Sequence, residues 1–167
     1  MSGDKALGKV LAILLYREKG MPGKSVKSVL AEESWGLEGD WHKENKERQI
    51  TILPREARQR NQEGFCLKKF KENIQTTGID FSQICPGDQI RIGETVIQVT
   101  GTLKKCYPEI CSLAARKEHC SLKEQCVFGM ILRSGRICIG DEVEILEKDP
   151  AGKMTEDPEL KIDKTSL

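Results

Sequence analysis

The sequence has no run of apolar residues long enough to span a bilayer, and its 167 residues carry almost no net charge. Lys and Arg number 27 against 26 for Asp and Glu, which gives a formal net charge of +1. No global field therefore draws the chain to nucleic acid or to a membrane surface, and any bound anion must be held by a local cluster of cations. The N-terminus places an acid and a glycine before a short apolar run, a pattern unlike a secretory signal. We expect a cytoplasmic protein with no membrane segment.

The chain also lacks a Cys-x-x-Cys pair, although it contains seven cysteines. Cytoplasmic cysteines are mostly thiols, and an odd number argues against a closed disulfide framework. The cysteines therefore require a metal, redox or nucleophilic explanation, or plain burial. Three of them, Cys66, Cys85 and Cys138, lie among apolar neighbours, and we expect these to be buried.

The segment from Thr100 to Gly129 contains the other four cysteines, Cys106, Cys111, Cys120 and Cys126, together with His119. Thiolates suit zinc or an iron–sulfur cluster, but structural zinc sites usually take ligands in pairs two to four residues apart. The spacing here is wider, which weighs against a single zinc site without removing it. We interpret the segment as a long functional loop with a helical turn.

A reactive thiol is the other interpretation of this loop. Cys106 directly follows Lys104 and Lys105, and nearby cations favour the thiolate, the form that attacks and ligates. The alternative is a buried, small, apolar side chain at a strand end, and the local residues favour neither interpretation over the other.

Short segments of branched or alternating apolar residues predict strands along most of the chain. They are Lys9–Tyr16, Val26–Ala31, Arg48–Leu53, Thr95–Thr100 and the strands that follow Gly-Asp in 86–93 and 139–146, with a hairpin turning at Ser134-Gly135. Pro54 opens a predicted helix, whose arginines Arg55, Arg58 and Arg60 we place on a solvated face. The fold class is mainly β with minor α: a small, partly closed β-barrel with one or two short helices. We assign residues 1–147 to one domain and 148–167 to a charged, disordered tail.

Asp40 and His42 form the tightest candidate pair outside the loop. Their spacing is compatible with a carboxylate that fixes the imidazole tautomer, but a turn capped by Asp40 beside a partly exposed His42 is the simpler interpretation.

Several motifs, in their order along the chain, resemble those of the MOSC domain, which is named for the C-terminal domain of molybdenum cofactor sulfurases. The resemblance is in particular to the small stand-alone members of this family. The matching stretches are G-L-E-G-D-W-H (36–42), R-Q-I-T-I-L-P-R-E-A (48–57), F-K-E-N-I-Q-T-T-G-I-D (70–80), P-G-D-Q-I-R-I-G (86–93), V-T-G-T-L-K-K-C (99–106) and G-R-I-C-I-G-D-E-V (135–143). The resemblance implies a barrel-like fold that binds the molybdenum cofactor, molybdopterin, and acts in sulfur or cofactor transfer.

The resemblance also implies roles for individual residues. The family cysteine falls on Cys106, which would carry a persulfide or ligate molybdenum, with Cys111 and Cys120 as further metal-ligand candidates. Small members often have His after this cysteine, whereas Tyr107 stands here, so general-base work at that position is in doubt. A cofactor-binding set follows from the need for cations and fixed polar groups: Asp40, His42, Arg48, Arg55, Glu72, Asn73, Lys104 and Lys105. For Glu72 and Asn73, a hydrogen-bonding pair at the entry to a strand is an equal alternative.

Several alternatives and partners follow from the same resemblance. The chain is too short to hold the pyridoxal phosphate domain that extracts sulfur in the sulfurases, so sulfur must come from a partner. Expected partners are cofactor biosynthesis or sulfuration proteins and recipient molybdoenzymes. The alternatives are a non-catalytic cofactor carrier or chaperone, and a zinc-stabilised β module. A reductase role, known in larger relatives, is unsupported because we expect no extra N-terminal domain.

Overall fold

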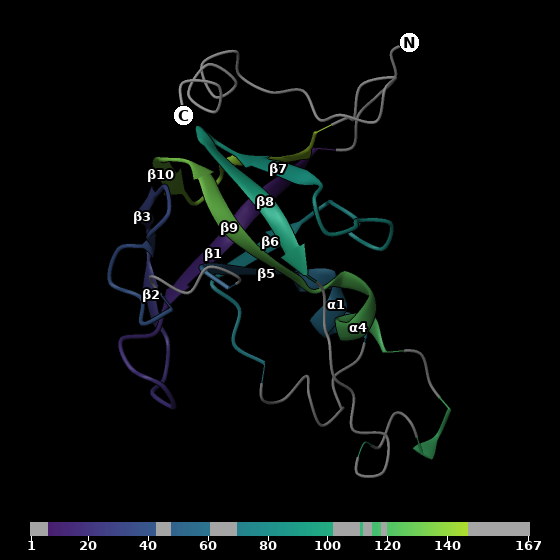
Figure 1. The fold of residues 1–167 in the computed structure, drawn as a ribbon. Coiled ribbons are helices and arrows are strands. Elements are labelled where there is room, and N and C mark those ends of the chain that lie inside the picture. The colour runs from purple at the N-terminus through teal and green to yellow at the C-terminus, as the bar shows by residue number, and fades with distance from the viewer. Residues whose placement is uncertain are drawn as a thin grey trace.

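A computed structural model describes residues 7–42, 48–60, 70–101, 111, 115–117 and 120–146. The described residues form eleven strands and two helices (Figure 1). In chain order these are β1 (Gly8–Leu15), β2 (Lys24–Val26), β3 (Ser28–Glu32), β4 (Gly36–Leu37), β5 (Ile50–Pro54), α1 (Arg55–Arg60), β6 (Ile74–Thr77), β7 (Gln89–Ile92), β8 (Thr95–Gly101), α4 (Ser121–Gln125), β9 (Val127–Arg133), β10 (Gly135–Cys138) and β11 (Glu142–Ile145). The predicted tail, 148–167, lies outside the described residues, as do Cys66 and Cys106.

Seven strands close into a mixed β-barrel in the order β11-β7-β8-β9-β5-β6-β1. The ring is completed where the start of β1 pairs with β11, with Gly8 opposite Val143 and Lys9 opposite Glu142. β5 and β6 run parallel, and the other neighbours in the ring are antiparallel. This ring confirms the expected small, mainly β barrel, and its closure leaves no open edge in the ring. β2 extends the sheet beside β1, and β10, β3 and β4 form a separate three-stranded sheet.

The barrel interior is filled by side chains that alternate along the strands. In β8 the residues Thr95, Ile97, Val99 and Gly101 are buried while those between them are half-buried. The interior consists mainly of isoleucine and valine, whose branched side chains suit a pleated surface. A second apolar cluster joins β5, α1, α4 and the start of β9, and the two helices lie together at one end of the barrel (Figure 1). In the described part of the chain, no helix is long and apolar enough to cross a membrane.

Two equivalent turns directly precede the neighbouring strands β7 and β11. The backbone N–H of Cys85 donates to the Asp88 carboxylate at 2.9 Å, and that of Cys138 donates to the Asp141 carboxylate at 2.8 Å. Within these turns, Gly87 has a φ of 98° and Gly140 a φ of 94°, values that residues with a Cβ rarely adopt. The two Gly-Asp motifs therefore act as strand-entry turns, and the strands that they start pair with each other.

The structure corrects three details of the expected strands. β9 and β10 are not a hairpin, because β10 pairs with β3 while β9 pairs with β5 and β8. The favoured two-residue hairpin turns need a positive φ, and neither Ser134 nor Gly135 has one. The expected strand 26–31 is divided at a bend at Lys27 into β2 and β3. Strand β4 was not expected, since its two residues are too few to show a period.

Candidate functional site

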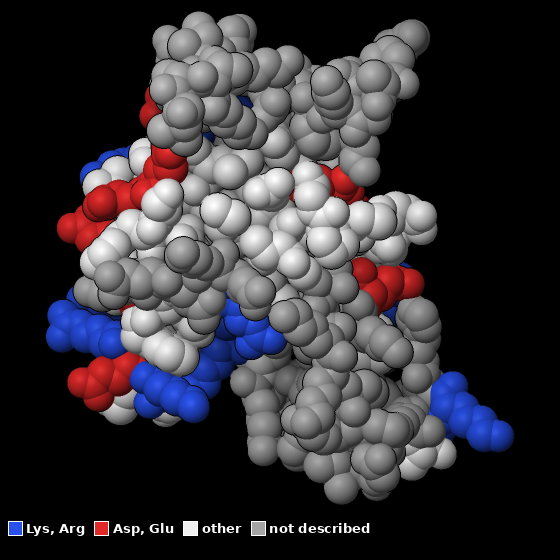
Figure 2. All heavy atoms as spheres, in the orientation of Figure 1, with Lys and Arg blue, Asp and Glu red and all other residues white. Residues whose placement is uncertain are grey.

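A cleft of about 380 Å³ opens beside the end of β1. Its described lining combines cations with aromatic rings. The lining residues are Tyr16, Glu18, Lys19, Gly20, Met21, Trp41, His42, Arg48, Thr51, Phe70, Lys71 and Phe128. They come from the β1–β2 loop, the segment after β4, the segment before β5, β5 itself, the segment before β6, and β9. Lys and Arg side chains gather at the lower left of the molecule in Figure 2, where the β1–β2 loop lies in Figure 1.

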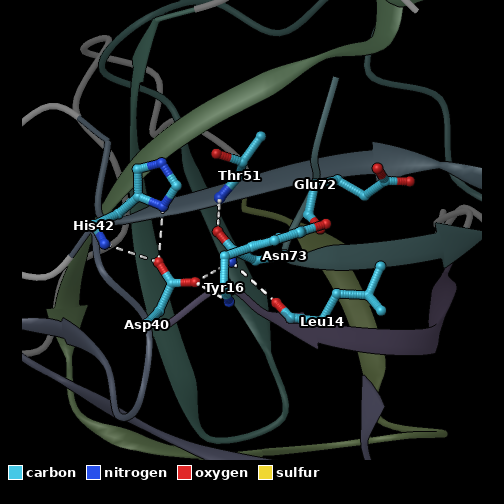
Figure 3. Close-up of polar contacts among 7 residues, drawn as sticks. All are labelled: Leu14, Tyr16, Asp40, His42, Thr51, Glu72 and Asn73. Atoms are coloured by element: carbon cyan, nitrogen blue, oxygen red, sulfur yellow. Dashed lines mark hydrogen bonds and ion pairs between the residues drawn. The ribbon is translucent and has the colours of Figure 1, made fainter. Parts of the chain in front are cut away.

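The Asp40 carboxylate, 1% exposed, is the centre of the polar network beneath this cleft (Figure 3). Its Oδ1 accepts hydrogen bonds from the backbone N–H of Tyr16 at 2.9 Å and from Asn73 Nδ2 at 3.0 Å. Its Oδ2 accepts from the backbone N–H of His42 at 3.0 Å and lies 2.8 Å from His42 Nδ1. Burial alone would raise the pKa of Asp40, but the hydrogen bonds from His42 and Tyr16 outweigh it and hold the pKa below its usual value.

His42 therefore belongs both to a capped turn and to a hydrogen-bonded pair. The sequence favoured the turn alone, and the 2.8 Å contact between Nδ1 and Asp40 adds the pair. The His42 side chain is 19% exposed. Its ring lies against that of Trp41, with 4.1 Å between the ring centroids and 34° between the planes.

Asn73 is fully buried, and every hydrogen-bonding group of its side chain is used within the protein. Oδ1 accepts from the backbone N–H of Thr51 at 3.1 Å, while Nδ2 donates to Leu14 O at 3.1 Å and to Asp40. Its backbone also bonds to both neighbouring strands, donating to Thr51 O at 2.9 Å and accepting from Leu14 N at 2.7 Å. Of the two interpretations of Asn73, this geometry favours strand entry over contact with a ligand.

Glu72 is 2% exposed and is paired with Arg58 from α1. Burial would raise the pKa of Glu72, but the hydrogen bonds and charge of Arg58 outweigh it and lower the pKa. Arg58 was expected on a solvated face; it is instead half-buried, and Nη2 also donates to Phe70 O at 2.8 Å. The pair therefore fixes the segment before β6, which contributes Phe70 and Lys71 to the cleft.

Tyr16 forms part of the cleft wall and connects the two buried acids. Its hydroxyl donates to Glu72 O at 2.9 Å, while its backbone N–H donates to Asp40. Burial, followed by the negative charges of Glu72 and Asp40, raises the pKa of Tyr16 to about 12. The phenol is therefore a neutral structural group at physiological pH.

Three cations stand at the cleft. The guanidinium of Arg48 lies over the Phe128 ring, 4.1 Å from its centroid. Lys71 Nζ donates to Met21 O at 3.2 Å and lies 5.8 Å from the centroid of the Tyr16 ring. Lys19 is exposed on the β1–β2 loop. Of the predicted cations, Arg48 thus lines the cleft, whereas Arg55, exposed at the start of α1, is not part of the described lining.

The cysteines and lysines of the long loop are mostly outside the described residues, including Lys104, Lys105 and Cys106. Cys111 is buried, and Cys120 packs half-buried against the apolar cluster that contains Cys126. Burial raises the pKa of the Cys126 thiol to about 12, so this thiol is not a nucleophile. Among the described residues, no three His, Cys, Asp or Glu side chains gather into a metal site.

Two of the cysteines expected to be buried are described, and they differ from that expectation. Cys85 is exposed and Cys138 is half-buried. Both begin a Gly-Asp turn, and the turn requires their backbone N–H groups rather than their side chains.

No local pattern predicted that one site would contain Tyr16, Lys19, Phe70, Lys71 and Phe128. They come from three segments far apart in the chain, and the stretch 70–80, which contains Phe70 and Lys71, was not connected with a cleft. Trp41 was identifiable only as the neighbour of His42, and its 38% exposure is high for a large apolar side chain. Exposed aromatic rings beside cations are a sign of a ligand site that only the folded chain reveals.

Comparison with protein families matches the MOSC domain to residues 39–144. The fold is similar to the crystal structure of the YuaD protein from Bacillus subtilis, with a TM-score of 0.62 and 18% identity over 85% of this chain and 97% of that one. It is also similar to YiiM from Geobacillus stearothermophilus, with a TM-score of 0.58 and 17% identity over 88% of this chain and 79% of that one. YiiM from Escherichia coli gives a TM-score of 0.54 and 19% identity over 84% and 70%. No curated protein matches the sequence.

Proposed function

The chain belongs to the MOSC family, and on that premise we propose that it binds the molybdenum cofactor in the cleft and passes sulfur or the cofactor to molybdoenzymes. The observation that carries this proposal is the combination of Arg48, Lys19 and Lys71 with the exposed face of Trp41 in one cleft. A cofactor made of a flat pterin and a phosphate needs cations for the phosphate and an aromatic face for the pterin.

The described residues fit such a group in size and chemistry. A volume of about 380 Å³ lies in the range of small-molecule sites, roughly 300–1,000 Å³. Arg48 and Lys71 are assigned to the phosphate, as a planar fork and a point charge respectively. Trp41 and Phe70 are assigned to the pterin ring, because flat apolar faces stack on it. When bound, the cofactor supplies a redox-active molybdenum centre.

Cys106 is proposed as the sulfur carrier. It follows Gly101 by five residues, a length whose extended reach is at most about 18 Å. Gly101 pairs with Phe128, which lines the cleft, so the reach of the chain covers the site. In the proposed step, the Cys106 thiolate attacks the outer sulfur of a donor's persulfide, and the donor leaves as its own thiolate. The donor is a partner that uses pyridoxal phosphate, and the recipient is a cytoplasmic molybdoenzyme.

The test begins with the protein as purified from cells that make the cofactor. We expect a bound pterin and molybdenum in equal amounts, and both should fall when Arg48 and Lys71 are replaced together by Ala. Cys106→Ala should abolish sulfuration of a recipient enzyme. Absence of pterin from the protein, together with full activity of Cys106→Ala, would overturn the proposal.

A carrier without sulfur transfer is the second candidate. It is favoured by the described cleft lining, which supplies groups for binding but contains no cysteine. Mass spectrometry of Cys106 after incubation with a persulfide donor separates the two functions. A mass increase of one sulfur atom at Cys106 supports transfer, and a bound pterin without that increase supports the carrier. A zinc-stabilised module instead predicts stoichiometric zinc, lost when Cys106, Cys120 and Cys126 are replaced.

A further inference from the structure

The two oxygens of Asp40 accept hydrogen bonds from different partners. Both partners at Oδ1 are N–H groups, which can donate a hydrogen bond but cannot accept one. Tyr16 N–H and Asn73 Nδ2 both donate to Oδ1. The backbone N–H of His42 donates to Oδ2. The donors at Oδ1 are buried and the His42 backbone is half-buried, so the carboxylate, bonded at both oxygens, is fixed in position and in its role as an acceptor.

The position of Asp40 determines which nitrogen of His42 carries the proton. Because Oδ2 only accepts, Nδ1, at 2.8 Å, must donate. In the neutral ring the lone pair is then on Nε2. Figure 3 shows this second ring nitrogen pointing away from Asp40. The Trp41 ring at 4.1 Å limits rotation of the imidazole, and His42 is part of the cleft wall.

Most of the polar side chains in the rest of the cleft are hydrogen-bond donors, whereas this lone pair is an acceptor. Arg48, Lys19, Lys71 and Trp41 can only donate hydrogen bonds. The Tyr16 hydroxyl already donates to Glu72 O. Besides Nε2, the acceptors among the described side chains of the cleft are the exposed carboxylate of Glu18, the hydroxyl oxygens of Thr51 and Tyr16, and the weakly accepting thioether of Met21.

We propose that Nε2 of His42 is the base of the cleft, in the sense that its lone pair accepts a hydrogen bond from an N–H or O–H group on the ring of the bound ligand. The ligand class is a flat heteroaromatic ring with an ionisable N–H or O–H group and a phosphate. This assignment rests on the proposed function only for the identity of the ring.

Asp40→Asn is a sharp test because the geometry favours one orientation of the new amide. Tyr16 and Asn73 both donate at the Oδ1 position, whereas one backbone N–H, that of His42, donates at Oδ2. The amide oxygen is therefore favoured at Oδ1 and the NH₂ group faces His42, with the loss of that one backbone hydrogen bond. Nδ1 then becomes an acceptor and the proton moves to Nε2. The substitution thus converts the base of the cleft into a hydrogen-bond donor at nearly constant shape.

The protein has two histidines, so ¹⁵N-labelled histidine gives two ring systems, and His119→Gln identifies that of His42. At about pH 8, where imidazole side chains are ordinarily neutral, we expect Nε2 of the wild-type His42 to resonate as an unprotonated nitrogen. In Asp40→Asn it should resonate as N–H. A proton on Nε2 in the wild-type protein would overturn the proposal without any variant.

The second measurement tests whether Nε2 faces the ligand. Diethyl pyrocarbonate modifies unprotonated imidazole nitrogens, and we expect His42 in Asp40→Asn to react about tenfold more slowly than in the wild type. A pterin monophosphate should shift the Nε2 resonance and protect His42, whereas inorganic phosphate should do neither. An unaltered Nε2 signal with a pterin that calorimetry shows to be bound would overturn the proposal. If calorimetry detects no pterin binding, the proposed function fails, and the tautomer and the rate ratio still decide whether Nε2 is a base.

Discussion

Arg58 and Glu72 face each other in a two-pronged ion pair: Nε donates to Oε2 at 2.9 Å and Nη2 to Oε1 at 2.7 Å. The pair connects α1 to the segment before β6. Since Glu72 is 2% exposed, its charge is tolerated only because this partner is present. Cleft residues Phe70 and Lys71 directly precede Glu72, so the stability of the pair and the shape of the site are linked.

Replacing Arg58 by Leu should therefore destabilise the protein strongly. The change leaves a buried carboxylate without its cation, which costs about 3 kcal/mol of unfolding free energy. Arg60→Leu is the matched control, because its contact with Glu124 is 3.4 Å long and solvent-exposed and is worth less than about 1 kcal/mol. Urea denaturation of both variants measures the difference. Equal small losses would show that the Arg58 pair is not a stabilising contact.

The same pair predicts how stability depends on acid. The pKa of Glu72 is lower in the folded protein than in the unfolded chain, so its contribution is present at neutral pH and is lost as the pH falls below about 4. In Arg58→Leu, burial without a cation favours the protonated acid, which reverses the sign. The stability gap between wild type and variant should shrink as the pH is lowered from 7 toward 4. A gap that stays constant over this range would contradict the assignment.

Asn73→Ala should lower stability because it leaves several buried partners unsatisfied. The backbone N–H of Thr51, the carbonyl of Leu14 and one oxygen of Asp40 would each lose a hydrogen bond. We expect a loss of about 3 kcal/mol, measured by urea denaturation. Gln75→Ala, which removes one 3.2 Å hydrogen bond to Glu72, should cost less than about 1.5 kcal/mol. An Asn73→Ala protein of wild-type stability that no longer binds a pterin would restore Asn73 as a ligand contact.

The cysteines should differ widely in reactivity. Cys85 is exposed, whereas Cys126 is 1% exposed and its pKa is raised to about 12 by burial. Iodoacetamide should therefore label Cys85 in the native protein and Cys126 only after denaturation. Peptide mass spectrometry at several labelling times measures both rates. Rapid native labelling of Cys126 would mean that the cluster around α4 opens.

Local sequence patterns predicted the positions of the strands better than they predicted which strands pair with each other. The alternation in 95–100 and the branched run in 9–16 correspond closely to β8 and β1, because a period of two follows from strand geometry itself. The closure of β1 onto β11 depends on contacts between opposite ends of the chain, which no local period encodes. The expected hairpin at Ser134-Gly135 failed for the same reason, since β10 pairs with the distant β3.

The site shows a similar division. Asp40 and His42 are two residues apart, and their pairing could be proposed from spacing. Asn73 lies 33 residues from Asp40, and its contact with that carboxylate results from the parallel placement of β6 beside β5. Arg58 was predicted to lie on a solvated face of the helix, because the sequence alone does not show which residue of the helix faces a buried acid. Long-range contacts of this kind become visible only in the folded chain.

The central claim, that the cleft binds a phosphate-bearing pterin, is tested most directly by the fluorescence of Trp41. The protein has two tryptophans, and Trp35→Phe leaves Trp41 as the single reporter. Titration with a pterin monophosphate should quench Trp41 saturably. Lys71→Ala should weaken the binding about tenfold or more, as expected for loss of a charged hydrogen bond, whereas the exposed Lys27→Ala should not. Unchanged Trp41 fluorescence, or equal affinity of Lys71→Ala and Lys27→Ala, would contradict the account.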